Sequence, residues 1–295
     1  MQNSEDLVSI IIPFYNAEKY IDRCVSSILN QTYKNIEAVF VSDGSNDNSI
    51  SKLNKYKNET IKIYSIDKSG VSVARNFGID KANGKYITFM DVDDELTDNF
   101  VEKLVVTIGR EKTDIVLCNY LEIYSDGKSK ENLLPWKEIK FNSKEIKEKL
   151  IANMIYSEKN EYHIDGLVWR MITTKKLIVD NNIRFVKGIK VAEDMLFTIQ
   201  LYNRANSIYF LNDCLYKYYK SKNSSMNKYY ENFFEEQLIY HKEFVSILKK
   251  EKLYEANKSR YLKNRLKMYT ISISNEIRNK NGSIKEKYKR IKYIR

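Results

Sequence analysis

The sequence predicts an α/β fold in which helices cover both faces of a mostly parallel sheet. Three observations predict it: short apolar runs recur along residues 1–120, helical patterns separate some of them, and polar clusters follow four of the runs. Strands that alternate with helices usually pair in parallel, because each connecting helix crosses back over the sheet. Ligands bind such sheets outside the carboxyl ends of the strands, so the polar clusters mark the predicted site.

The predicted strands are short and almost continuously apolar, as expected for strands buried on both faces. They are Val8–Ile12, Ile36–Val41, Ile61–Ile66, Tyr86–Met90 and Asp114–Asn119. Between the first two, apolar residues at helical spacing over Ile21–Leu29 predict a helix with Asn16 as its N-cap. A second helical pattern covers Val73–Ala82.

After residue 120 the pattern becomes mainly helical. Helical segments are predicted near 143–156 and 165–180, and another helix from about Glu193. A strand-like run at Ser207–Tyr219 precedes two amphipathic helix patterns that fill the end of the chain. We therefore predict three parts, which span residues 1–120, 121–227 and 228–295.

Composition places the chain among globular proteins, with 43% hydrophobic residues, 30% charged residues and only two prolines. Residues 228–295 hold 18 Lys or Arg against 8 Asp or Glu, a net charge of +10 out of +11 for the whole chain. Three widely spaced cysteines predict reduced thiols and a cytoplasmic location. No apolar run approaches the roughly 20 residues of a membrane span, so we expect a protein that is neither secreted nor integral to a membrane.

Two of the polar clusters suggest chemistry of their own. Asp91-Val92-Asp93-Asp94 follows a strand, where carboxylates repel one another unless a divalent cation lies between them; the alternative is a solvated acidic turn. Lys68–Asn76 offers backbone N–H groups at a helix N-terminus and Arg75 one turn later, which suits a diphosphate; the alternative is a capped helix with a solvated arginine. The glycines match neither a P-loop nor a dinucleotide-binding fingerprint.

Taken together, the clusters resemble a known family. Ile10–Asn16, Asp43-Gly44-Ser45, Gly70–Asn76 and Asp91–Asp94 occur in an order and spacing similar to the nucleotide-binding half of family 2 glycosyltransferases of bacterial polysaccharide type. The resemblance covers residues 7–120 strongly and 165–226 more loosely. It implies a GT-A fold, with a Rossmann-like sheet flanked by helices, in which residues 1–120 bind the nucleotide sugar and 121–227 bind the acceptor. Residues 228–295 would form a basic helical extension.

The resemblance also implies roles for single residues. Those implied for nucleotide-sugar binding are Pro13, Tyr15, Asp43, Lys68, Arg75 and Asp91. Asp93 would ligate Mn²⁺ or Mg²⁺, and Asp94 could share that role. In Glu193-Asp194 the second residue, Asp194, would be the catalytic base; without the resemblance it would be a carboxylate favoured by the N-terminus of a helix.

The sequence departs from the family pattern at two places. Ser42 stands where many relatives have a second Asp, and Lys220 or Lys222 would have to supply a charge that some relatives take from His or Arg. Trp169 suits either an acceptor platform or a core anchor. His163 and His241 are too far apart in sequence to suggest one site, and we expect both to be structural or solvated.

The implied activity is metal-dependent, inverting transfer of a hexosyl group. The donor would be a nucleoside-diphosphate sugar, UDP-hexose or UDP-N-acetylhexosamine, and the acceptor a hydroxyl of a glycan or lipid-linked molecule in surface polysaccharide synthesis. Alternatives are a catalytically silent nucleotide-sugar binder and a basic nucleic-acid-binding protein. The basic extension suits either the anionic inner face of the cell membrane or a solvated cap on the domain.

Overall fold

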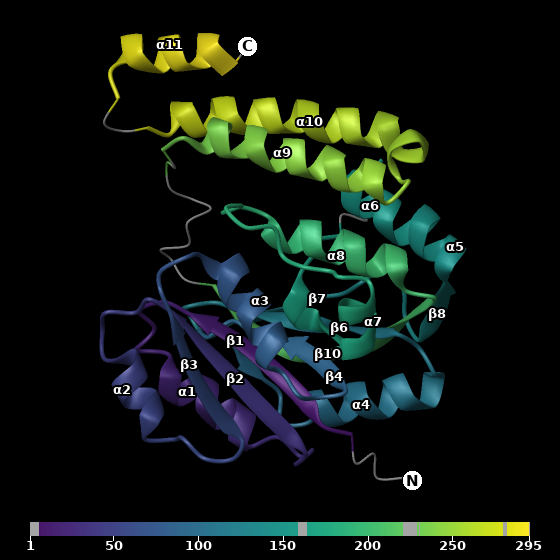
Figure 1. The fold of residues 1–295 in the computed structure, drawn as a ribbon. Helices are drawn as coiled ribbons and strands as arrows, with labels where there is room; N and C mark the ends of the chain where they lie inside the picture. The colour runs from purple at the N-terminus through teal and green to yellow at the C-terminus, as the bar shows by residue number, and fades with distance from the viewer. Residues whose placement is uncertain (1–5, 159–163, 221–228, 230, 280–281, 295) are drawn as a thin grey trace.

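The computed structural model describes residues 6–158, 164–220, 229, 231–279 and 282–294 (Figure 1). The strands within these ranges are β1 Val8–Phe14, β2 Ile36–Asp43, β3 Ile61–Ile66, β4 Tyr86–Phe89, β5 Glu95–Leu96, β6 Ile115–Ile123, β7 Ser129–Asn132, β8 Ile139–Asn142, β9 Met171–Thr174 and β10 Ser207–Tyr219. They form one sheet in the order β3-β2-β1-β4-β9-β6-β10-β5, with β7 beside β6 and β8 beside β10.

The helices are α1 Ile21–Leu29, α2 Ser49–Asn54, α3 Val71–Lys81, α4 Phe100–Glu111, α5 Ser143–Glu145, α6 Ala152–Ile155, α7 Lys175–Asp180, α8 Glu193–Arg204, α9 Phe233–Lys250, α10 Tyr254–Ile277 and α11 Ile284–Ile294. A π-helical segment at Ile146–Ile151 joins α5 to α6, and a 3-10 turn at Val168–Arg170 precedes β9.

The first four strands of the sheet are parallel, and the antiparallel pairings lie beyond them. β1 pairs in parallel with β2 and β4, and β2 with β3. β9 then runs antiparallel between β4 and β6, while β6 and β10 are parallel to each other. The carboxyl ends of β3, β2, β1 and β4 therefore meet at one edge, where the polar clusters follow them.

Alternate residues of each central strand face opposite layers of helices. Val8, Ile10 and Ile12 belong to a hydrophobic cluster with side chains of α1 and α4. Ile11 points to the other face, where α3, α7 and α8 pack. This period of two explains why the strand is apolar throughout. The predicted α/β sheet, flanked by helices and followed by a helical region, is confirmed.

Two local predictions were wrong. Residues 165–180 are not one helix, because Met171–Thr174 forms β9, whose ladder hydrogen bonds to β4 and β6 outweigh a helical pattern in the sequence. Asn16 is not the N-cap of α1, which begins at Ile21. Asn16 instead has a φ of 49°, and its Oδ1 accepts a hydrogen bond from the N–H of Asn46, so it joins the loop after β1 to the loop after β2.

The C-terminal helices lie above α8 in Figure 1, with α9 and α10 side by side and α11 at the far end. Phe244 and Leu248 of α9 and Tyr261 of α10 belong to the same hydrophobic cluster as α8 and the sheet. The start of this region is thus packed onto the body of the protein. None of the helices in the described residues has both the length and the apolar character needed to cross a bilayer.

Candidate active site

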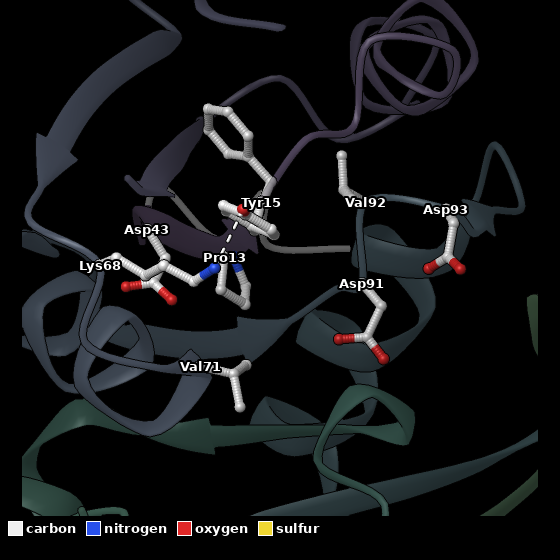
Figure 2. Close-up of a pocket in the computed structure, with 9 residues that line it drawn as sticks. Pro13, Tyr15, Asp43, Lys68, Val71, Asp91, Val92 and Asp93 are labelled. Carbon is white, nitrogen blue, oxygen red and sulfur yellow. Dashed lines mark hydrogen bonds between the residues drawn. The ribbon is translucent and has the colours of Figure 1, made fainter. Parts of the chain in front are cut away.

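A cavity of about 300 Å³ opens at the shared edge of β1, β2, β3 and β4 (Figure 2). Its lining residues all lie at or just after the ends of these strands or at the start of α3. They are Pro13, Phe14, Tyr15, Asp43, Lys68, Val71, Asp91, Val92 and Asp93. Six of the eight residues predicted for the site are in this list. The other two, Arg75 and Asp194, lie beside the cavity and are connected to it through Asp91.

Tyr15 and Lys68 form one wall of the cavity. The Lys68 Nζ donates a hydrogen bond to the Tyr15 Oη at 3.0 Å, drawn as the dashed line in Figure 2, and lies 4.1 Å from the centre of the ring. Tyr15 keeps 43% of its surface exposed. An exposed aromatic face beside an ammonium group is suited to stacking on a base and attracting a phosphate.

Asp43 organises the loop between β3 and α3. Its carboxylate accepts hydrogen bonds from the backbone N–H of Ser69 at 2.6 Å and of Gly70 at 2.9 Å. Gly44, with a φ of 70°, lies so close to this loop that a Cβ would come within 2.8 Å of the Lys68 backbone. Asp43 is 7% exposed and holds the cavity wall in place, a structural role in addition to the predicted recognition of the base.

The acidic loop after β4 divides its carboxylates between the cavity and the interior. Asp94 is 1% exposed, and its two carboxylate oxygens accept hydrogen bonds from the Tyr216 Oη and the Tyr219 N–H, each at 2.8 Å. Asp91 and Asp93 face the cavity (Figure 2). Burial, together with the neighbouring Asp91 carboxylate, raises the pKa of Asp93. Asp94 therefore anchors the loop and is not available to share a metal with Asp93.

The acidic loop can contribute two carboxylates to a cation. Asp91 and Asp93 both line the cavity. Among the described residues, no group of three or more His, Cys, Asp or Glu side chains is placed to hold a metal by itself. Mg²⁺ is commonly held by one or two carboxylates together with substrate phosphates and water. Two carboxylates beside this cavity fit this mode. A cation there would counter the effects of burial and of the neighbouring Asp91 carboxylate, which raise the pKa of Asp93.

Arg75, in the second turn of α3, joins the cavity to α8. Its guanidinium is buried and lies 3.0 Å from Asp91, 2.8 Å from Glu193 and 2.6 Å from Asp194. The Arg75 guanidinium thus pairs with three carboxylates, and Asp91 is more than a hundred residues away in sequence from the other two. All three contacts are to protein carboxylates, so in this structure Arg75 positions acidic groups and does not line the cavity where the base or diphosphate was predicted to lie.

Asp194 lies in the first turn of α8 and is surrounded by other charged groups. Burial raises its pKa, Arg75 opposes that shift, and Glu193 and Asp91 add to it. Gly166 lies against this turn so closely that a Cβ would approach the Met195 Cα to 2.7 Å. A carboxylate with a raised pKa, held by the arginine that also pairs with Asp91 at the cavity, has the properties of a general base.

Sequence reasoning missed several residues of this site. Phe14, Val71 and Val92 line the cavity, and Tyr216 and Tyr219 hold Asp94. Phe14 and Val92 lie next to predicted site residues, and Val71 lies within the predicted Lys68–Asn76 segment, so their positions in the sequence could have identified them. The tyrosines come from β10, and the sequence held no sign that this strand would reach the acidic loop.

The remaining predictions concern residues near β10. Trp169 is 4% exposed and stacks on Tyr216 with 4.2 Å between the ring centres, which favours the core-anchor alternative. The Lys220 Nζ is 3.1 Å from Glu122. Lys222 and His163 lie outside the described residues. His241 is buried on α9.

Known proteins similar to this chain are glycosyltransferases. Residues 9–162 match the family described as glycosyl transferase family 2. Among relatives, the cholesterol galactosyltransferase of Borreliella burgdorferi is 30% identical over 71% of this chain and 59% of its own length. GlyG of Streptococcus pneumoniae is 31% identical over 75% of this chain and 73% of its own length, and EpsJ of Bacillus subtilis is 30% identical over 79% and 66%. The chain therefore spans less than two thirds of the length of some of these relatives.

Solved structures give the same result for the fold. Residues 1–349 of S. aureus TarS in complex with UDP-GlcNAc superpose with a TM-score of 0.72, at 23% identity over 97% of this chain and 79% of that one. The UDP complex of the same protein gives 0.61, at 25% identity over 80% and 64%. The chain has a GT-A fold, and its match to the family covers residues 9–162, more than half of its length. The chain therefore belongs to glycosyl transferase family 2.

Proposed function

We propose that this protein is an inverting glycosyltransferase. It transfers a sugar from a nucleoside-diphosphate sugar, UDP-hexose or UDP-N-acetylhexosamine, to a hydroxyl of a glycan or lipid-linked acceptor in surface polysaccharide synthesis. The UDP-GlcNAc complex of TarS supports a UDP-sugar donor. The Borreliella relative, named for galactosyl transfer to cholesterol, supports a hydroxyl on a lipid as one class of acceptor.

One observation carries the proposal: residues from four strand ends converge on one cavity, and Arg75 ties that cavity to Asp194. The Arg75 guanidinium is within 3.0 Å of both Asp91, at the cavity, and Asp194, on α8. A donor in the cavity would thus lie next to a carboxylate that can take a proton from an acceptor. This arrangement separates the donor-binding residues from the base, as a single-displacement reaction requires.

Asp91 and Asp93 are the residues that would hold Mn²⁺ or Mg²⁺. When bound, the metal would neutralise negative charge on the diphosphate and so favour its departure. Lys68 would attract the same phosphates from the opposite wall of the cavity, and Tyr15 would stack on the base. Arg75 would hold the Asp91 and Asp194 carboxylates in fixed positions relative to each other.

In the proposed reaction Asp194 accepts the proton of the acceptor hydroxyl. The hydroxyl oxygen then forms a bond to the anomeric carbon of the sugar, the bond from that carbon to the β-phosphate oxygen breaks, and UDP leaves with the electron pair. Attack opposite the departing diphosphate inverts the anomeric configuration, so an α-linked donor gives a β-linked product. Such a base typically contributes about 10²–10⁴-fold to the rate.

A panel of nucleotide sugars with Mn²⁺ or Mg²⁺, scored by released nucleotide, tests the proposal. We expect one UDP-sugar to be turned over, with release abolished by EDTA and restored by excess metal. Proton NMR of the product would give its anomeric configuration. Binding of UDP without any turnover, unchanged in Asp194→Asn, would favour the silent binder instead. Salt-sensitive binding to oligonucleotides without turnover would favour the nucleic-acid alternative.

We also propose that the C-terminal region associates peripherally with an anionic membrane from the cytoplasmic side. On α11, Ile284 is 88% exposed, Tyr288 69% and Tyr293 62%, and exposed lysines lie between them. Each cation near such a surface contributes about 1 kcal/mol. Co-sedimentation with vesicles containing anionic lipid should weaken in Lys285→Glu/Lys289→Glu. Equal sedimentation of variant and parent would contradict the association.

A further inference from the structure

A second cavity of about 470 Å³ lies between the N-terminal end of α8 and the helices α9 and α10. It is larger than the cleft at the strand ends and shares no lining residue with it. Cavities of this size accommodate small organic ligands. The proposed donor chemistry leaves it unused.

Apolar side chains make up about half of the residues that line this cavity, and polar or charged side chains make up the rest. Met195 comes from α8, Tyr240 from α9, and Met268 and Ile271 from α10. His241 also lines it and is 4% exposed, yet its Nδ1 has no hydrogen-bond partner within the described part of the chain. Burial, aided by Arg265, lowers the pKa of His241 to about 4, so the imidazole is neutral near pH 7.

The charged residues that line the cavity are mostly cationic. Lys190, Lys267 and Arg278 contribute to the lining, against the single carboxylate of Asp165. Lys190 is paired with Glu236 at 2.7 Å, whereas Lys267 is exposed on α10. An apolar space with a cationic rim is complementary to a molecule that has an apolar chain and an anionic head.

The position of the cavity links it to the proposed base. Ala192 and Met195 line it, and Glu193 and Asp194 lie between these two residues in sequence. The carboxylates of Glu193 and Asp194 contact Arg75, on the side of the donor cleft. The first turn of α8 therefore lines the second cavity and is joined through Arg75 to Asp91 at the donor cleft.

We infer that this second cavity binds the apolar chain and phosphate of a lipid-linked acceptor, and so brings a sugar hydroxyl of that acceptor toward Asp194. The inference rests on the proposed function and specifies its acceptor. The chain would pack against Met195, Met268 and Ile271, and the cationic rim would hold the phosphate.

Calorimetric titration of the full chain with decyl phosphate, below its micelle concentration and without vesicles, tests the inference. We expect saturable binding at one site, with much weaker binding of inorganic phosphate. Ile271→Trp should fill the cavity and weaken binding about tenfold, the cost of leaving two methylenes unburied. Lys267→Glu should weaken it roughly threefold, as for one exposed ion pair. The same substitutions elsewhere on α10, Leu266→Trp and Lys258→Glu, serve as matched controls and should bind like the parent.

The outcomes separate the two proposals. No saturable binding, or equal weakening in the control variants, overturns the inference whether or not the protein turns over a UDP-sugar. Binding that only Ile271→Trp and Lys267→Glu weaken supports it. Release of UDP from the nucleotide sugars, measured on the same preparations with glycan and lipid-linked acceptors present, reports on the proposed function alone. No release with any donor and acceptor, alongside retained decyl phosphate binding, would overturn the transferase proposal and leave the ligand class of the cavity in place.

Discussion

The two halves of the sheet differ in how far apart in sequence their contacting residues lie. In residues 7–120, β1, β2, β3 and β4 pair as parallel neighbours, and each contributes a short polar cluster from its own end. Beyond them, β9 inserts between β4 and β6, and β10 reaches back to β5. The first half builds a binding cavity from local motifs. The second half supplies the proposed base through long-range contacts.

Arg75 is the point at which the two halves meet. It belongs to α3 in the first half, yet two of its three carboxylate partners, Glu193 and Asp194, are in the second. Donor binding and proton transfer should therefore be separable by mutation, because the cavity is complete without α8. The following predictions test that separation, from the largest expected effect to the smallest.

Replacing the base should slow transfer strongly and spare donor binding. Asp194→Asn keeps the size and hydrogen-bonding shape of the side chain but removes its capacity to accept a proton. We expect kcat to fall about 10³-fold, within the range for a general base, while the affinity for the UDP-sugar measured by calorimetry changes little.

Glu193→Gln is the matched control for that change. Glu193 shares the same guanidinium at 2.8 Å and lies one residue away. Its replacement should lower kcat no more than about tenfold, the effect of weakening one charged hydrogen bond. Equal losses in the two variants would contradict the assignment of the base to Asp194 and would point to a shared structural role.

Replacing the proposed metal ligand should act in the first half alone. Asp93→Asn removes one of two carboxylates at the cavity, so we expect transfer to fall about 10²-fold at low metal, with partial recovery at high Mn²⁺. Metal titrations of the initial rate give the measurement. Asp98→Asn, an exposed aspartate shortly after the same loop, should behave like the parent protein. A metal dependence unchanged by Asp93→Asn would place the cation elsewhere.

The pH profile should distinguish the base from an ordinary surface carboxylate. Because burial, with Glu193 and Asp91 contributing, raises the pKa of Asp194, the side chain becomes protonated at a higher pH than a free carboxyl group. Transfer should therefore fall about tenfold per pH unit on the acidic side of that raised pKa. Glu193→Gln removes one neighbouring negative charge and should move this acidic limb to lower pH. A limb near pH 4, or one that Glu193→Gln leaves in place, would contradict the assignment.

The same contrast explains what could be predicted from the sequence. The donor edge was predictable because each cluster directly follows its own strand, and strand order follows from short βαβ connections. The strand β9 was not, because four residues between a 3-10 turn and a short helix carry too little pattern to reveal a strand held by β4 and β6. Arg75 was recognised as a charged group near the site, but its three carboxylate partners depend on how α8 packs. Asp93 and Asp94 are adjacent and chemically identical, and only the contacts with Tyr216 and Tyr219 separate their roles.

That pair gives the smallest expected effect, on stability. Asp94→Ala leaves the Tyr219 N–H and the Tyr216 hydroxyl buried without their acceptor, so we expect the free energy of unfolding to fall by about 1–3 kcal/mol in urea titrations. Asp93→Ala should leave it unchanged or slightly higher, because it removes a carboxylate whose pKa is raised by burial and by Asp91. Asp94→Asn, which keeps an acceptor for the Tyr219 N–H, should lie between the two. If Asp93→Ala proved the more destabilising change, Asp93 would be the anchor of the acidic loop, and the division between a cavity-facing and an interior carboxylate would be wrong.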